Sequence, residues 1–316
     1  MGLSGIALVT GGAGFIGSHI AQTLVARGAR VRVIDNLSTG HLDNIEAIGA
    51  SADFIRGDLA DEGAVRKAVE DIEIIFHEAA LPSVPRSVTN PRETHLACVD
   101  GTFNLLLAAK EAGVRRLIYA ASSSAYGDQP TLPKVESMRP EPLSPYAAAK
   151  LVGEYYCQVF NRSYNFETIC LRYFNVFGPR QDPSSPYSGV VSRFLEFLTK
   201  GGRPVIYGDG EQTRDFTYIS NAVDANMLAA EGDKAVGQII NIANGEQVSI
   251  NELFRQLKEI TGHHDVEPEY QPARTGDVMH SLADISRARD LLGYAPKVGL
   301  AEGLQATTEW FARRQD

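Results

Sequence analysis

A glycine-rich stretch near the start of the chain limits what the chain can fold into. The stretch TGGAGFIG, residues 10–17, lies between an apolar β-rich run and a helical pattern over Gly14–Ala26. Gly11, Gly14 and Gly17 allow a tight turn, a close approach of backbone to a pyrophosphate, and packing of helix on strand. Backbone amides at the start of a helix also favour bound anions. The stretch predicts the first unit of a dinucleotide-binding fold.

β-rich apolar runs alternate with amphipathic helical patterns over residues 1–174. This alternation predicts an α/β fold, a Rossmann-type doubly wound parallel sheet with helices on both faces. Over 175–316 short runs mix with Gly, Pro and Asp, and we expect a smaller mixed α/β C-terminal lobe for the substrate. The expected strands of the sheet are Ile6–Thr10, Val31–Asp35, Asp53–Arg56, Ile72–His77, Arg116–Ser122 and Glu167–Arg172, with Gln238–Ala243 returning to it from the second lobe. The other expected elements are helices over Asp61–Glu70, Glu93–Ala112, Pro145–Tyr164, Asn251–Thr261 and Ile285–Leu292, and short strands at Pro204–Tyr207 and Phe216–Ile219.

Asp35 ends the second expected strand, 18 residues after Gly17. A carboxylate there accepts hydrogen bonds from a ribose diol and repels a 2′-phosphate, which favours NAD over NADP. Asp58 follows the third strand and can reach the adenine.

Bulk properties exclude several classes of protein. A formal net charge of −9 and a pI near 5.3 argue against nucleic acid as a partner, because phosphates need a basic surface. The sequence holds no apolar run of the roughly 20 residues that cross a bilayer. The three scattered cysteines predict reduced thiols, and a strand almost at the N-terminus leaves no room for a signal peptide, so we expect a cytoplasmic protein. His263 and His264 lack a sensibly spaced third ligand, and no metal is expected.

Tyr146 and Lys150 stand four residues apart on an expected helix and therefore share one face. A nearby ammonium and a positive nicotinamide ring both favour a phenolate and lower the tyrosine pKa from about 10. The tyrosine can then take a hydroxyl proton while hydride leaves for the cofactor. Ser122, at the end of the fifth strand, can hydrogen-bond the same oxygen.

With these features on one chain, the sequence resembles an extended short-chain dehydrogenase/reductase over essentially its whole length. It is most similar to nucleotide-sugar 4-epimerases of the UDP-glucose and UDP-N-acetylglucosamine type. The matching segments are TGGAGFIG, IDNLSTG, RGDL, HEAA, ASSSAYG, PLSPYAAAK, RYFNVFGPRQDP, GDGEQTRDF and RTGDV. The resemblance implies a tightly held NAD, removal of hydride from sugar C4, turnover of the 4-keto sugar, and return of hydride to its other face.

The resemblance also implies roles for individual residues. Tyr146 is the expected acid/base, Lys150 its electrostatic helper and ribose anchor, and Ser122 its hydrogen-bonding partner. Further cofactor contacts are implied for Phe15, Ile16, Asn36, Ser38, Leu59, Ala79, Ala80 and Tyr173. Substrate contacts are implied for Ser83, Ser123, Asn175, Val190, Tyr207, Arg214, Arg274, Asp277 and Ser281, with the two arginines on the diphosphate.

Two positions depart from the family pattern. Cys98 stands where most relatives carry an asparagine that helps to orient the site, so the local hydrogen bonding is expected to differ. Ala121 stands where many relatives have one more serine.

The residues after Ser122 separate the reactions that share this fold. Related 4,6-dehydratases carry Asp-Glu there, and related decarboxylases a glutamate, whereas this chain has Ser123 and Ser124. Epimerisation needs neither carboxylate. Ser281 is a small residue at the position where a bulky tyrosine restricts related enzymes to plain hexoses, which predicts interconversion of UDP-GlcNAc and UDP-GalNAc, with UDP-Glc and UDP-Gal weaker.

Alternatives remain open. One alternative is a UDP-glucose 4-epimerase. Another is a UDP-glucuronate 4-epimerase, since Arg86, near Ser83, would suit the carboxylate of its substrate. A catalytically silent NAD-binding scaffold is a more remote alternative. The resemblance implies a homodimer through the helices at Glu93–Ala112 and Pro145–Tyr164, with apolar outer faces buried between subunits.

Overall fold

A seven-stranded parallel sheet forms the centre of the computed structural model, which describes residues 5–49, 51–183, 189–273 and 278–313. The strand order is β11-β6-β5-β4-β1-β2-β3, and every neighbouring pair is parallel. This is the Rossmann-type sheet that the sequence predicts. Its strands are β1 (Ile6–Thr10), β2 (Arg30–Asp35), β3 (Ala52–Arg56), β4 (Ile72–His77), β5 (Arg116–Ser122), β6 (Glu167–Tyr173) and β11 (Ile239–Ile242).

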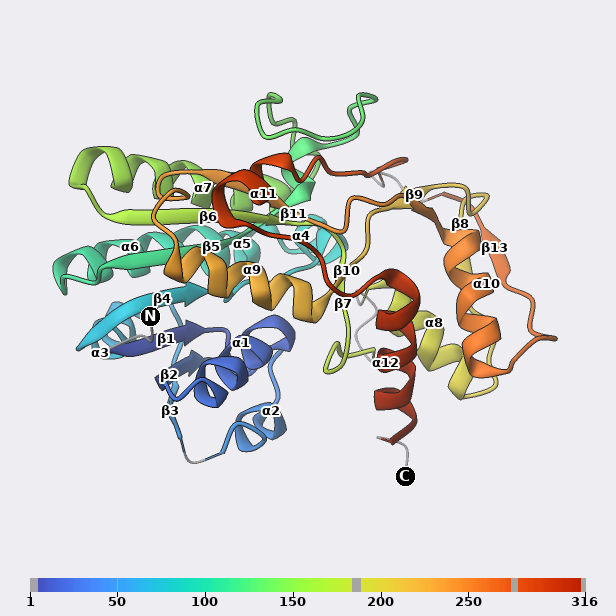
Figure 1. Ribbon diagram of the computed structural model, residues 1–316, viewed down its shortest axis with the longest axis horizontal. Helices are drawn as coiled ribbons and strands as arrows, with labels where there is room; N and C mark the ends of the chain where they lie inside the picture. Colours follow the sequence, from blue (N-terminus) through green and yellow to red (C-terminus); the bar gives the residue numbers. More distant parts are fainter. Residues whose placement is uncertain (1–4, 50, 184–188, 274–277, 314–316) are drawn as a thin grey trace.

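Helices cover both faces of this sheet (Figure 1). Alternate side chains of a strand point to opposite faces, and β1 shows the result: Ala7 and Val9 join one buried cluster, while Leu8 joins the other. One face carries α1 (Phe15–Ala26), α9 (Ile219–Glu231) and α11 (Ser286–Leu292), and the other α3 (Glu62–Ala68), α6 (Gly101–Glu111) and α7 (Pro145–Tyr164).

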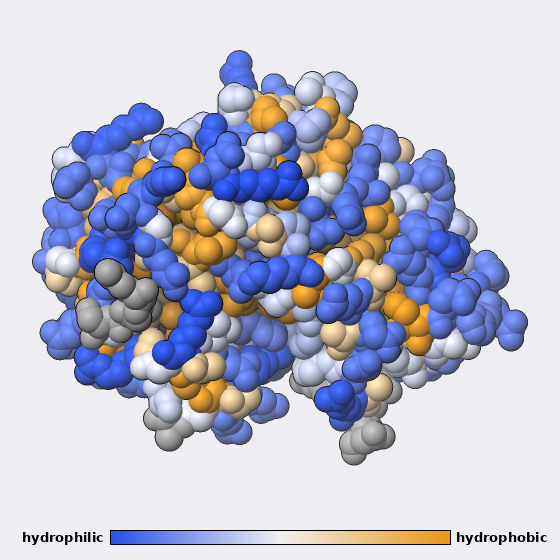
Figure 2. Space-filling view, viewed as in Figure 1, coloured by the Kyte–Doolittle hydropathy of each residue, from blue (hydrophilic) through white to orange (hydrophobic). Residues whose placement is uncertain are grey.

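The second lobe has its own core, packed between α8 (Val190–Thr199), α10 (Ile250–Thr261) and α12 (Leu300–Arg313). The inner side of α10 buries Leu253, Phe254 and Leu257. The region around α10 is largely hydrophilic on the surface drawn in Figure 2, as the polar face of an amphipathic helix should be. Outside the main sheet, the described residues form three two-stranded sheets: β7 (Val176–Phe177) with β10 (Thr217–Tyr218), β8 (Val205–Tyr207) with β13 (Glu269–Gln271), and β9 (Thr213–Arg214) with β12 (Val248–Ser249).

The segment expected as one helix over Glu93–Ala112 is instead three segments. α5 (Pro91–His95) leads into a π-helical turn, η1 (Leu96–Asp100), and then into α6. The expected strand at Phe216–Ile219 is also shorter, because α9 already begins at Ile219. The strand expected to return to the main sheet is confirmed as β11, which pairs with β6. The remaining short elements are α2 (Leu42–Glu46), α4 (Val84–Thr89) and η2 (Ser123–Tyr126).

Candidate active site

A cavity of about 1090 Å³ opens at the carboxyl ends of the strands, beside the second lobe. In open α/β sheets this edge is where ligands bind. Nearly all described residues singled out from the sequence line it. They are Gly11, Gly14, Phe15, Ile16, Gly17, Asp35, Asn36, Ser38, Asp58, Leu59, Ala79, Ala80, Ser83, Ser122, Ser123, Tyr146, Lys150, Tyr173, Asn175, Arg214 and Ser281.

The glycine-rich turn leaves no room for side chains where the chain doubles back. Gly11 has a φ of +66°, and a Cβ there would lie 2.7 Å from the Ala79 nitrogen. A Cβ on Gly17 would lie 2.3 Å from the Gly11 carbonyl oxygen. The bare backbone ahead of α1 is therefore a cradle of the kind that holds a pyrophosphate.

Asp35 fixes the loops around the adenosine end of the cavity. Its carboxylate accepts N–H bonds from Ala13 at 3.0 Å and from Leu37 at 2.7 Å. Burial raises the Asp35 pKa, and these two bonds oppose that shift. Asn36 donates to the Asp58 carboxylate at 2.8 Å, which ties the second and third strand ends together. An acidic end of this kind fits NAD, because a 2′-phosphate would meet carboxylates.

Tyr146 and Lys150 lie on the first turns of α7, which begins at Pro145 behind the Ser144 N-cap. The Lys150 Nζ donates to the Ala120 carbonyl at 2.7 Å and lies 4.9 Å from the centre of the Tyr119 ring. These contacts hold the face of α7 that carries Tyr146 and Lys150 against β5. Ser122 ends β5, so strand and helix bring the three residues to one wall of the cavity.

The protonation of this trio depends on its surroundings. Burial raises the pKa of the Tyr146 phenol above its usual value, Cys98 raises it further, and hydrogen bonding with Ser122 lowers it. Burial lowers the pKa of the Lys150 ammonium, against the opposing effects of Cys98 and Glu78. The raised pKa keeps the phenol protonated at neutral pH, so the phenol is ready to donate a proton.

Cys98 occupies the π-helical turn η1 and is buried against Ala149. A chain of hydrogen bonds connects its backbone to the glycine-rich turn. Thr10 Oγ1 lies 2.8 Å from Nδ1 of His77, and Nε2 of His77 lies 2.9 Å from Thr102 Oγ1, which donates to the Cys98 carbonyl at 2.7 Å. Since the Ala79 amide donates to Thr10, all bonds are satisfied with the proton of His77 on Nε2.

Burial lowers the pKa of His77 to about 3, so it is neutral. Its hydrogen bonds to two threonines give it a structural role. Ala121, the other departure from the family pattern, is buried on β5 opposite Arg172.

The residues that the family resemblance assigns to the sugar and diphosphate come from both lobes. Ser83 is the N-cap of α4 and accepts the Arg86 amide proton at 3.0 Å. Arg214 donates to the Thr213 carbonyl at 2.8 Å, and the Ser281 amide donates to the same carbonyl at 3.1 Å. Val190 and Tyr207 lie in α8 and β8 and are not among the residues that line the cavity, whereas Arg274 and Asp277 lie outside the described residues.

Glu78 and Lys134 are charged residues of the cavity wall that the sequence-based set lacks. Glu78 follows β4, and Lys134 lies on the segment between η2 and α7, where its Nζ donates to the Gln129 carbonyl. A charged residue directly after a buried parallel strand was a usable signal for Glu78. Lys134 had no such signal, because its place is set by distant pairing of its backbone with Leu282 and Asp284.

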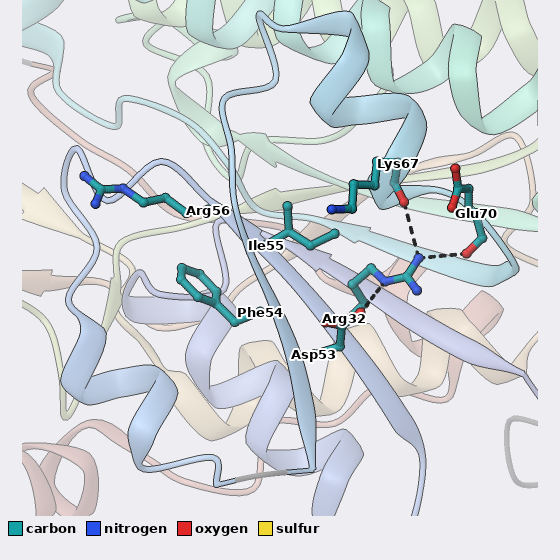
Figure 3. A pocket seen from close by; sticks show the side chains of 7 residues that line it. All are labelled: Arg32, Asp53, Phe54, Ile55, Arg56, Lys67 and Glu70. Carbon is teal, nitrogen blue, oxygen red and sulfur yellow. Dashed lines mark hydrogen bonds and ion pairs between the residues drawn. The ribbon is translucent and has the colours of Figure 1, made fainter.

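A smaller hollow lies against strands β2 and β3, at the edge of the sheet that β3 forms (Figure 3). Arg32 crosses it and donates to the Asp53 carboxylate and to the Glu70 carbonyl, each at 2.8 Å. It also donates to the Ala68 carbonyl at 3.1 Å. Arg32 therefore caps the end of α3 and ties it to strands β2 and β3, so the role of this hollow is structural.

Fold and cavity together define a dinucleotide-binding protein of the Rossmann class. A model of the NAD dependent epimerase/dehydratase family matches residues 7–243, and the chain belongs to that family. NAD is accordingly its cofactor, and the bare glycine backbone and acidic adenosine end fit that molecule.

Individual relatives match over nearly the full chain. The UDP-glucose 4-epimerase of Mycolicibacterium smegmatis is 40% identical over 311 residues, 97% of this chain and 98% of that protein. The structure of Thermotoga maritima UDP-glucose 4-epimerase with UDP-glucose has a TM-score of 0.94 at 40% identity, covering 98% of this chain and 100% of the other. That of Methanobrevibacter ruminantium UDP-N-acetylglucosamine 4-epimerase, in complex with UDP-N-acetylmuramic acid, has a TM-score of 0.93 at 40% identity, covering 98% and 99%.

Within the described part of the chain, no three His, Cys, Asp or Glu side chains converge on a point where a metal ion could bind. No helix among those residues combines the length and apolar character that crossing a membrane requires. Cys98, Cys157 and Cys170 are all buried and free.

Proposed function

We propose that this protein is an NAD-dependent 4-epimerase of UDP-hexoses, with UDP-GlcNAc and UDP-GalNAc as its preferred pair. The observation that carries the proposal is a single cavity that joins the glycine cradle, the Ser122–Tyr146–Lys150 trio and side chains of the second lobe. Such a cavity accommodates a dinucleotide and a nucleotide sugar end to end, with the trio where they meet.

The chemistry divides between cofactor and chain. When bound, NAD would supply a hydride acceptor for sugar C4 and a positive charge that favours the Tyr146 phenolate. The Tyr146 oxygen takes the C4 hydroxyl proton and later returns it to the 4-keto sugar. Burial opposes phenolate formation, so the Lys150 ammonium and the Ser122 hydroxyl must stabilise that anion when substrate is bound. Ser122 also contacts the reacting oxygen.

Elimination and decarboxylation are disfavoured by the residues beside the trio. Ser122 Oγ lies 2.8 Å from Ser124 Oγ, and the Ser124 amide donates to Ser122 at 3.2 Å. This turn presents hydroxyls where those reactions need a carboxylate. Oxidation and reduction at one carbon need only a reversible proton donor and a hydride acceptor.

Ser281 supports the acetylated sugars. It lines the cavity, and its hydroxymethyl group is small at the position where a tyrosine would fill space. An N-acetyl group on sugar C2 has that space available. UDP-Glc and UDP-Gal fit the same cavity with fewer contacts, so we expect them to turn over more slowly.

A UDP-glucuronate 4-epimerase is the second candidate. It depends on Arg86, the cation that would bind the carboxylate of that substrate. Arg86 lines the cavity, but its guanidinium makes a two-pronged ion pair with Glu93, at 2.5 and 3.2 Å. A substrate carboxylate would have to compete with Glu93 for the same donors. This pairing favours a neutral sugar.

We also propose a homodimer. Tyr155 and Val159 lie four residues apart on the outer face of α7 and are each 50% exposed. Leu96 on η1 and Tyr164 at the end of α7 are exposed too. Apolar side chains on neighbouring helices suit a two-fold interface. Sedimentation should give twice the chain mass for the wild type and the chain mass for Val159→Glu.

Proton NMR of the C4 configuration tests the function. The protein is incubated without added NAD with UDP-GlcNAc, UDP-Glc and UDP-GlcA separately, and the expected product is UDP-GalNAc, formed fastest. UDP-Glc conversion about tenfold faster than UDP-GlcNAc conversion would overturn the substrate assignment. No conversion of any sugar, even with NAD added, would leave a catalytically silent NAD-binding protein as the better reading.

A substitution tests the Ser281 argument separately. Ser281→Tyr should lower UDP-GlcNAc turnover by about tenfold or more and leave UDP-Glc turnover within about threefold. Ser51→Tyr, in an exposed turn, is the matched control and should change neither rate. Equal losses on both sugars would mean that residue 281 does not discriminate at C2.

A further inference from the structure

Glu78 is a carboxyl in the wall of the cavity for which the proposed reaction has no use. It directly follows β4, on the same wall as Tyr146 and Lys150. The Tyr173 hydroxyl, at the end of β6, donates to Glu78 Oε1 at 3.0 Å. Asn226 of α9 donates in turn to the Tyr173 oxygen at 2.7 Å. Three elements therefore hold this carboxyl in one orientation.

The groups that face Glu78 act on its charge in opposite directions. Burial raises the Glu78 pKa, and the Tyr173 hydrogen bond and the Lys150 ammonium lower it, with the result at about 7. Glu78 in turn raises the pKa values of Tyr146 and Lys150 on α7. Asn226 is neutral and acts only through Tyr173. The carboxyl is thus in electrostatic contact with the residues proposed to flank the nicotinamide.

We propose that the Glu78 carboxylate makes the site prefer the oxidised cofactor over the reduced one. The inference rests on the proposed function for the end of the cavity at which the nicotinamide lies. The nicotinamide ring is positive in NAD⁺ and neutral in NADH, so a fixed negative charge nearby stabilises only the oxidised form. An epimerase must finish each cycle with its cofactor oxidised. A wall that favours NAD⁺ biases hydride return to the 4-keto sugar.

This preference should depend on pH. Free NAD⁺ and NADH change no charge between about pH 6 and 8.5, so a change in their relative affinity reports a group of the protein. Glu78 gains its negative charge across this window. The ratio of the NADH to the NAD⁺ dissociation constant should rise roughly tenfold over it, which corresponds to about 1.4 kcal/mol.

The test follows fluorescence of bound NADH while NAD⁺ displaces it, across that pH range, in cofactor-free protein. Glu78→Gln keeps an acceptor for Tyr173 but has no charge, and its ratio should stay flat. Tyr173→Phe removes the bond that lowers the Glu78 pKa, so the rise should move to higher pH. Glu111→Gln, the same charge change on exposed α6, should behave as the wild type.

A rise in Glu78→Gln equal to that in the wild type would overturn the inference and leave Glu78 as an anchor for Tyr173. The binding experiment contains no sugar, so it is independent of sugar turnover. Absent sugar conversion would therefore count against the proposed function. A ratio of dissociation constants that does not change with pH in the wild type would count only against the inference about Glu78.

Discussion

Gly17→Ala should cost this protein most of its NAD affinity. The added Cβ would lie 2.3 Å from the Gly11 carbonyl oxygen and 2.9 Å from two further backbone atoms of the turn. Backbone cannot rotate away as a flexible side chain can, so the whole turn must shift. Overpacking of this kind costs about 1–3 kcal/mol. Alanine also has a higher helix propensity, which returns at most about 1 kcal/mol of stability to α1.

The shifted turn misplaces the amides that would meet the pyrophosphate. At 1.4 kcal/mol per tenfold, a loss of about 1–3 kcal/mol weakens NAD binding by roughly 5- to 150-fold. Calorimetric titration of cofactor-free protein measures this loss. Gly299→Ala is the matched control, because no atom lies within 4 Å of its new Cβ. NAD affinity of Gly17→Ala within about twofold of the wild type would refute the steric reasoning.

Three further predictions concern the trio and two buried carboxyls. Tyr146→Phe should bind NAD normally but slow UDP-sugar interconversion by about 10²–10⁴, and NMR rates near those of the wild type would exclude Tyr146 as the acid/base. Burial raises the Asp215 pKa to about 6. The folded state therefore holds an extra proton between about pH 4 and 6, and the Asp215 contribution to stability falls by up to about 3 kcal/mol as pH rises through that window. Urea titrations should show this slope reduced in Asp215→Asn. In the wild type, the Glu154 carboxylate pairs with the buried Arg172 guanidinium at 2.6 and 2.8 Å. Glu154→Gln should lower the free energy of unfolding by about 3–5 kcal/mol, because it leaves that guanidinium without its counter-charge. The double variant Glu154→Leu/Arg172→Met should recover most of that loss. A double variant as unstable as Glu154→Gln would contradict the explanation by an unpaired buried charge.

The sheet was predictable because its signals are local. Strands buried on both faces give continuous apolar runs, and β1 with its glycine-rich turn is recognisable from a dozen residues. The π-helical turn at Leu96–Asp100 was not predictable, because one extra residue in a turn barely changes hydrophobic periodicity. α9 was missed for another reason. It buries Ala225, Met227, Ala229 and Ala230, on several sides at once, which erases the one-sided pattern of a helix.

The same distinction applies to the candidate site. Tyr146 and Lys150 could be paired from their spacing alone, since four residues make one helical face. Glu78 owes its environment to Tyr173, which is 95 positions away in the chain. Lys134 is positioned by backbone bonds to Leu282 and Asp284. No local pattern carries such contacts, and only the folded chain brings these charges into the cavity wall.

The pairing of β11 with β6 determines how this chain can be divided. A fragment ending at residue 174 would lose the neighbour of Cys170 through Tyr173, together with α9 and α11 from one face of the sheet. Its last strand would then be a bare hydrophobic edge, open to pairing with other chains. Exchange of the second lobe between homologues therefore needs additional junctions on each side of the segment that supplies α9 and β11. Thermal unfolding should also occur in a single transition, in which both lobes unfold together.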